Sequence, residues 1–282
     1  MEDYFDIKKK FLREKNADLA NGLYKDFNKA LSRKQFCSSL SGDSKKLDEF
    51  EKKMINLCDR INSVGFALYQ IKKEEKDWEK FIETAYHPDR LHSRTMASYV
   101  IGAEKPTTLE FAFESFLFFA DATFEYLSQT IGVIFSDPNV KRISELKNVL
   151  KNNYSNEKLA QKILEILEKG KPLWAEIQEK GVRDFFENVE PYVNTYEGRS
   201  LRDIVAHYRA IKVSPIQMTV GRKGIDSANT LKAGAWKDRL GEKPRFGDLH
   251  GLVYKTEDYV NRLVNWIEAL LELTYGAEST SF

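Results

Sequence analysis

The central stretch of the sequence reads Ser200-Leu201-Arg202-Asp203-Ile204-Val205-Ala206-His207-Tyr208-Arg209. Ser200, followed three residues later by Asp203, is an acidic variant of the capping box, so the stretch predicts a helix start. At about 100° per residue, one apolar stripe runs along this helix. Its members are Leu201, Ile204, Val205, Tyr208 and Ile211. Arg202 and Arg209 share one flank of the stripe, while Asp203 and His207 share the polar side and are close enough to hydrogen-bond. One face therefore serves the core, and the Arg, Asp and His residues are left for another role.

The size and composition of the chain favour a globular protein built from long helices. Its 282 residues are enough for one sizeable core, and 42% hydrophobic with 31% charged residues is typical of globular proteins. Only 15 Gly and 7 Pro leave few helix breaks. A net charge of +1 gives no overall attraction to nucleic acid or membrane, so any polyanion site has to be local.

Cysteine content and hydropathy predict a cytoplasmic protein. Two cysteines, Cys37 and Cys58, cannot form a disulfide framework, which indicates a reducing compartment. The acidic N-terminus is not followed by an apolar run, so we do not expect a signal peptide. The most apolar stretch, residues 111–135, contains three acidic residues, which favours a buried helix over a membrane span. We expect a soluble cytoplasmic protein without membrane contacts.

Apolar residues at spacings of three and four predict helices along most of the chain. The predicted helices cover residues 3–35 (one helix or two), 44–85, 107–135, 139–152, 156–169, 173–191, 201–213 and 255–275, with a loop at 37–43. Apolar residues alternate with polar ones at Ile216, Met218 and Val220, and the turn at residues 221–224 is followed by a predicted second strand at residues 228–236. This segment predicts at most a small β-hairpin insertion between residues 214 and 236. The predicted fold class is an all-α helical bundle. Residues 1–100 are expected to form an N-terminal helical extension packed on a domain of residues 101–282.

The sequence contains few other groups with metal or nucleophile chemistry. His87 and His92, with Asp89 between them, lie at a proline-bearing helix end and have no cysteine pair beside them. Zinc needs three or four converging ligands, so we expect no metal and no cofactor. The segment Gly221–Gly224 does not join a strand to a helix as a phosphate-binding loop does, and is interpreted as a hairpin turn. No serine or cysteine nucleophile signature is present.

Arg202 and His207 form an Arg-x4-His pattern at the start of a helix, and this pattern resembles the catalytic motif of the HEPN superfamily. HEPN domains are compact helical bundles, and many are metal-independent ribonucleases of toxin–antitoxin, abortive-infection and CRISPR defence systems. The family motif usually places a polar residue after the arginine, and Asp203 takes that position here. The resemblance covers about residues 107–275 and leaves residues 1–100 outside.

A second Arg-x4-His pattern runs from Arg245 to His250. It contains Gly247, lacks a capping residue, and has Phe246 where the family has a polar residue, so we interpret it as a loop. The whole segment 214–251 is also longer than the connection expected before the last helix of the family.

The resemblance implies RNA cleavage with Arg202, His207 and Asp203 as catalytic residues. Histidine titrates in the range needed to move the proton of a 2′-hydroxyl or of the leaving 5′-oxygen. Arginine offers an always-charged fork for the phosphate, and Asp203 holds the histidine tautomer from one turn away. Because the nucleophile is the 2′-hydroxyl, the substrate is RNA. Arg209 and Ser200 are the expected substrate-binding residues.

The resemblance also implies partners. Two motif helices would form a shared cleft in a homodimer, and a cognate antitoxin or nucleotidyltransferase is the expected protein partner. The expected function is that of a toxin-like endoribonuclease in stress response or defence. The alternative is a non-catalytic HEPN-like module that binds nucleotides or proteins, in which Arg202 and His207 are ordinary residues of a polar helix face.

Overall fold

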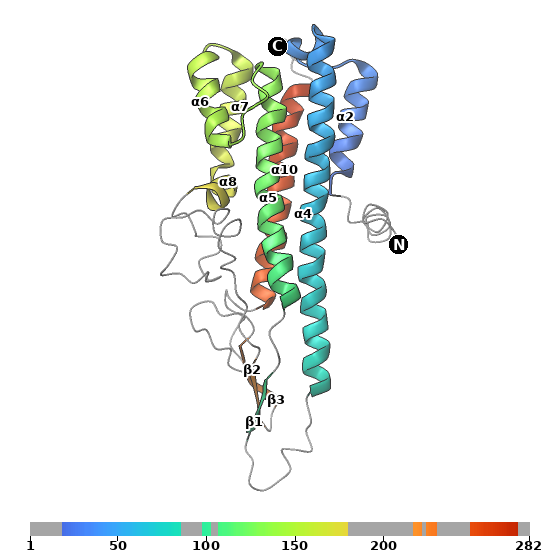
Figure 1. Cartoon of the computed structure of the whole chain (residues 1–282), viewed down its shortest axis with the longest axis vertical. Helices are drawn as coiled ribbons and strands as arrows, with labels where there is room; N and C mark the ends of the chain where they lie inside the picture. The colour runs from blue at the N-terminus through green and yellow to red at the C-terminus, as the bar shows by residue number, and fades with distance from the viewer. Residues whose placement is uncertain are drawn as a thin grey trace, which may run out of the picture. The chain divides into compact units, whose positions relative to one another are not determined.

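The computed structural model describes residues 19–85, 98–102, 107–179, 217–221, 224–229 and 249–275 (Figure 1). Most of these residues are helical, which confirms the prediction of a mainly helical fold. The helices are α2 (Asn21–Arg33), α3 (Ser38–Ser41), α4 (Ser44–Ala85), α5 (Thr107–Ile134), α6 (Ile143–Asn153), α7 (Lys158–Lys169), α8 (Lys171–Gln178) and α10 (Leu249–Tyr275). The strands are β1 (Ser98–Gly102), β2 (Gln217–Gly221) and β3 (Gly224–Asn229).

The chain divides into two compact units that interleave along the sequence. The first comprises residues 1–66, 118–179 and 259–282, and holds α2, α3, α6, α7, α8 and parts of α4, α5 and α10. The second comprises residues 67–117 and 180–258, and holds the strands and the remaining parts of the long helices. The predicted division of the chain at residue 100 stays a prediction.

Local signals explain where the long helices begin and end. The Asp43 carboxylate accepts the backbone N–H of Lys45 at 3.0 Å and of Lys46 at 3.2 Å, which satisfies the first turn of α4. Past the end of α5, Ser136 adopts a left-handed backbone with φ 58°, as residues after a helix end often do. The Asp137 N–H then donates to the Gly132 carbonyl at 2.9 Å. A Cβ on Gly132 would lie 2.2 Å from the Asp137 carbonyl oxygen, so this close return of the chain requires glycine.

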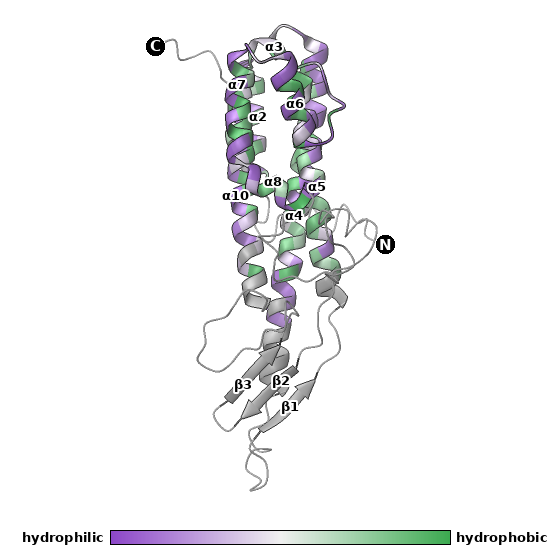
Figure 2. Cartoon of the chain, turned by 90° about the vertical axis from the view of Figure 1, so that its left-hand side faces the viewer, coloured by the Kyte–Doolittle hydropathy of each residue, from purple (hydrophilic) through white to green (hydrophobic). Residues whose placement is uncertain are grey.

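An aromatic cluster joins α2, α4 and α10 in the first unit. Phe27 and Phe36 lie against Phe50 and Tyr275, with ring centroids 6.2 or 6.3 Å apart. At the other end of α2, the Ala20 N–H donates to Asn62 Oδ1 at 3.1 Å. Aromatic pairs at such distances stabilise beyond their buried area, so α2 is an integral part of this core. Figure 2 shows apolar and polar residues alternating along the helices, as expected where each helix buries one face.

Three basic residues of α4, spaced by seven, contact α5. Lys46 Nζ donates to the Ile134 carbonyl at 3.2 Å, and Lys53 Nζ donates to Gln129 Oε1 at 2.6 Å. Arg60 lies over the Tyr126 ring, 5.5 Å from its centroid. A seven-residue spacing keeps one flank of a helix against a neighbouring helix, so these contacts fix α4 along α5 within the first unit.

Trp266 of α10 packs against the junction of α7 and α8. Its ring packs edge-on against Phe124 of α5 at 6.0 Å, and its Nε1 donates to the Ile166 carbonyl at 2.8 Å. A Cβ on Gly170 would lie 2.1 Å from Trp266 Cε2. Gly170 is therefore required because the indole ring occupies the space of a side chain there.

In the second unit, the strands form an antiparallel sheet in the order β1-β2-β3. The register aligns apolar residues with one another, since Met218 of β2 pairs with Ile101 of β1 and with Ala228 of β3. The β2–β3 pairing confirms the predicted hairpin, but its second strand was predicted too late, at residues 228–236, whereas β3 begins at Gly224. Strand β1 was not predicted. The Lys72–Glu257 ion pair, 2.5 Å long, joins α4 to α10 in this unit.

Two predicted loops are wrong in part. Residues 38–41 form the short helix α3 within the predicted loop 37–43, because the Leu40 and Ser41 N–H groups donate to the Cys37 carbonyl. The last helix begins at Leu249 and not at residue 255, so His250 is helical and not in a loop. The spacing of Leu249, Leu252 and Val253 continues the apolar stripe of α10 and outweighs the helix penalty of Gly251, about 1 kcal/mol.

We expect Glu268→Gln to stabilise the protein at neutral pH. Partial burial, with the nearby charges of Asp26 and Glu272, raises the pKa of Glu268 above its ordinary value. The folded state then binds the Glu268 proton more tightly than the unfolded state, so the wild type loses stability as the pH rises through the folded pKa. The variant should show a higher melting temperature than wild type at pH 7 and no advantage at pH 3. Glu51→Gln, also on a helix surface, is the control. An equal rise in melting temperature for both variants at pH 7 would contradict the raised pKa of Glu268 as the cause.

Candidate functional site

The five predicted site residues lie outside the described part of the chain. Ser200, Arg202, Asp203, His207 and Arg209 all fall between α8 and β2, within residues 180–216. The structure therefore neither brings these side chains together nor separates them. Their assignment as catalytic and substrate-binding residues rests on the sequence alone.

The second Arg-x4-His pattern is only partly described. Arg245 lies outside the described residues, and His250 is the second residue of α10. His250 therefore lies in the first turn of a helix, and not in the loop that was predicted for the second pattern. The choice between the two patterns rests on the sequence.

The structure does not test the prediction that the main candidate residues bind no metal. His87, Asp89 and His92 lie within residues 86–97, which the structure does not describe. Over the described ranges, no group of three or more His, Cys, Asp or Glu side chains is placed to hold a metal ion.

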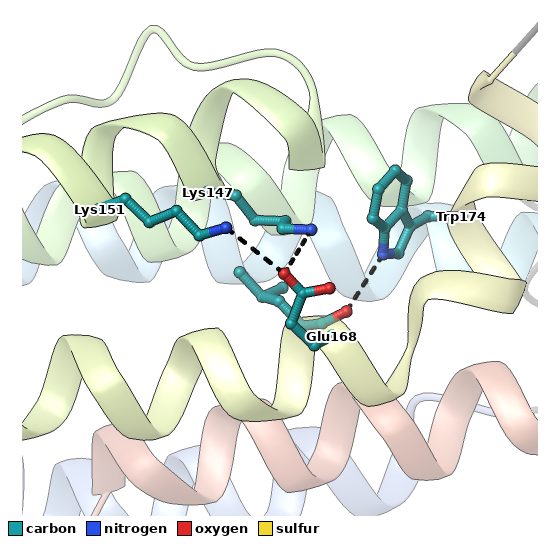
Figure 3. Close-up of polar contacts among 5 residues, drawn as sticks. Lys147, Lys151, Glu168 and Trp174 are labelled. Atoms are coloured by element: carbon teal, nitrogen blue, oxygen red, sulfur yellow. Dashed lines mark hydrogen bonds and ion pairs between the residues drawn. The ribbon is translucent and has the colours of Figure 1, made fainter.

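An ion-pair cluster links α6, α7 and α8 (Figure 3). Lys147 Nζ lies 2.8 Å from Glu168 Oε1, and Lys151 Nζ lies 3.6 Å from the same oxygen. The hydrogen bond from Lys147 lowers the pKa of Glu168, and Lys147 also lies 5.2 Å from the centre of the Trp174 ring. Because Trp174 Nε1 donates to the Leu167 carbonyl at 3.3 Å, the cluster orders the α7–α8 junction. We assign it a structural role.

Buried polar groups gather where α5, α8 and α10 meet in the first unit. The Tyr259 hydroxyl donates to the Leu173 carbonyl, and burial raises the pKa of Tyr259, with the charges of Glu176 and Asp121 acting in the same direction. Gln178 Nε2 donates to Asp121 Oδ1 at 3.0 Å, and Glu176 is buried. A buried tyrosine with a raised pKa stays neutral and acts as a fixed donor, which fits a role in holding α8 to α10.

The two cysteines are buried and are not paired with each other. Burial raises the pKa of Cys37, which keeps it in the thiol form. Since the thiolate is the reactive species, Cys37 is not suited to nucleophilic chemistry.

No family model matches the chain, and no match was found among curated proteins or among solved structures. The HEPN assignment therefore stays a proposal that rests on the motif. Within the part of the chain that the structure describes, no helix is both long enough and apolar enough to cross a membrane.

Proposed function

We propose that the chain is a metal-independent endoribonuclease of a stress-response or defence system, of HEPN type. The observation that carries this proposal is the sequence pattern from Ser200 to His207, which predicts a capped helix start with Arg202, Asp203 and His207 on its non-apolar sides. These residue types at this spacing suit acid–base chemistry and phosphate binding. The mainly helical fold of the described residues agrees with the fold that this family would have.

The charge distribution around the motif supports an RNA substrate. Residues 199–245 contain 11 basic and 4 acidic residues, a net charge of +7, although the whole chain carries only +1. A local excess of this size attracts a polyanion even when the overall charge is near zero. The basic excess therefore coincides along the sequence with the proposed catalytic residues.

The proposed reaction is an internal transesterification. His207 takes the proton of the 2′-hydroxyl, whose oxygen attacks the adjacent phosphorus while the bond to the 5′-oxygen breaks, and the leaving 5′-oxygen takes a proton from solvent water. Arg202 holds the non-bridging phosphate oxygens, and Asp203 orients the imidazole. The products are a 2′,3′-cyclic phosphate and a 5′-hydroxyl, and no metal takes part.

Expression in a bacterial host gives a direct test in cells. We expect the wild type to slow growth and degrade cellular RNA, and the His207→Ala variant at the same level to do neither. Equal growth and intact RNA with both proteins would favour the alternative, a non-catalytic module that binds nucleotides or proteins.

We also propose that the active form is a two-fold homodimer whose two motif helices share one cleft. The sequence pattern places Arg202 and His207 off the apolar stripe of the predicted helix, so both would be available for a composite site. Light scattering should give the mass of a dimer at micromolar concentration. Full cleavage activity from a protein that is monomeric under the same conditions would contradict the shared cleft.

A further inference from the structure

Helices α6 and α7 carry a local excess of positive charge. Residues 141–171 contain eight basic and four acidic residues, a net charge of +4. Two of the four acids are already engaged by the protein. Glu145 accepts the backbone N–H groups of Lys141 and Arg142, and Glu168 pairs with Lys147 and Lys151. The other two acids, Glu157 and Glu165, are outnumbered by the remaining basic residues, so the segment keeps a net positive charge.

The outward face of α7 concentrates three of these cations in one row. Lys158, Lys162 and Lys169 are spaced by four and seven residues, so they lie on the same side of the helix, and all three are exposed. The opposite side is buried through Ala160, Ile163 and Leu167. At about 1.5 Å per residue, the ammonium groups stand along a rigid row of about 16 Å, interrupted by a single carboxylate, Glu165.

None of the exposed residues of α7 is apolar, and Leu159, Leu164 and Ile166, which flank its buried face, are half-buried. Its exposed residues are Lys158, Gln161, Lys162, Glu165, Glu168 and Lys169. The large exposed apolar side chains of the described residues (Ile55, Phe111, Phe118 and Tyr254) all lie on other helices. A protein-binding surface normally has an apolar centre, whereas contacts to phosphates need only positive charge and hydrogen-bond donors. A polyanion fits this row better than a folded protein does.

We propose that the α7 row of Lys158, Lys162 and Lys169 binds the phosphate backbone of single-stranded RNA. The choice of RNA rests on the proposed function, because a ribonuclease has to hold its substrate beyond the bond that it cleaves. The contacts are to phosphate, so the row adds affinity without reading the base sequence.

The test measures RNA affinity as a function of salt. A fluorescent single-stranded RNA is titrated with the full chain carrying His207→Ala, with and without Lys158→Gln, Lys162→Gln and Lys169→Gln, at several salt concentrations. Each lost phosphate contact should lower the slope of log affinity against log salt by about 0.7, so the triple variant should lose about 2. The control replaces Lys25, Lys45 and Lys52 by Gln, which removes the same charge from exposed positions of other helices. The control should keep the slope of the parent, and circular dichroism checks that all variants are folded.

The outcomes separate this inference from the proposed function. A salt slope that is lowered by the triple lysine variant of α7 and not by the control supports RNA binding by the α7 row. This conclusion holds whether or not the chain with His207 intact cleaves the RNA. Equal slopes for the two triples would overturn it, as would the absence of RNA binding by the parent. Loss of binding to poly-glutamate with an unchanged RNA slope would also overturn it, since the row would then bind acidic polypeptides.

Discussion

Replacing His207 by Ala should lower the rate of RNA cleavage about 10²–10⁴-fold, the range for loss of a general acid or base. The imidazole is the only group of the motif that titrates near neutral pH, so no neighbour in the motif can replace it. Single-turnover cleavage of a labelled RNA by the purified variant measures the effect. Since the proposed mechanism places His207 at the reacting oxygen, the loss should fall on the chemical step, with RNA affinity changed little.

Three further variants show whether the motif acts as proposed. Arg202→Lys should retain only part of the wild-type activity, since an ammonium group lacks the forked contact of a guanidinium. Asp203→Asn should do less harm than His207→Ala, because an amide still orients the ring in part. His250→Ala is the matched control, since it removes the histidine of the second Arg-x4-His pattern. Wild-type activity in both the Arg202→Lys and the His207→Ala variants would contradict the assignment of these residues to the site.

The second large effect concerns stability. Trp266→Ala should lower the free energy of unfolding by about 3–5 kcal/mol, the usual range for removing a large buried aromatic side chain. Trp266 is 7% exposed, contacts Phe124, and donates a hydrogen bond to the Ile166 carbonyl. Trp266→Phe is the control, since it keeps much of the packing and should cost less. Urea denaturation followed by circular dichroism measures the free energy of unfolding of both variants. Equal losses for Ala and Phe would contradict stabilisation by the packing of a large aromatic ring at this position.

Gly170 provides a second variant for the same contact. Gly170→Ala should cost about 1–3 kcal/mol, because its Cβ would fall 2.1 Å from the Trp266 ring. In the Trp266→Ala background the ring is absent, so the same change should cost much less. A double-mutant cycle measures this coupling, and additive effects would show that the two residues do not touch.

The local signals of the sequence predict much of the helical structure. Both ends of α4 and the start of α5 agree with the predicted ranges, because Asp43, Pro88 and Thr107 lie close to these ends. The hairpin was predicted because its first strand alternates in polarity and ends at a glycine-bearing turn. Such signals depend on neighbouring residues, which are visible in any sequence.

Contacts between distant segments could not be predicted in the same way. The sequence shows Gly170 only as a residue between the predicted helices 156–169 and 173–191, whereas its necessity comes from Trp266, a residue far along the chain. The start of α10 was placed too late because Gly251 weakens the local helix signal. For the α7 row, the lysine spacing is visible in the sequence, but burial of Ile163 and Leu167 on the other side is what identifies it as an outward face. The motif residues around His207 remain a prediction from the sequence.

The most direct test of the central claim is cleavage of a labelled single-stranded RNA by the wild type in the presence of a metal chelator, with analysis of the product ends. We expect cleavage at the same rate with and without chelator, and fragments that end in a 2′,3′-cyclic phosphate or its opened form. Activity that disappears with the chelator, or no cleavage by the folded wild type, would contradict a metal-independent ribonuclease.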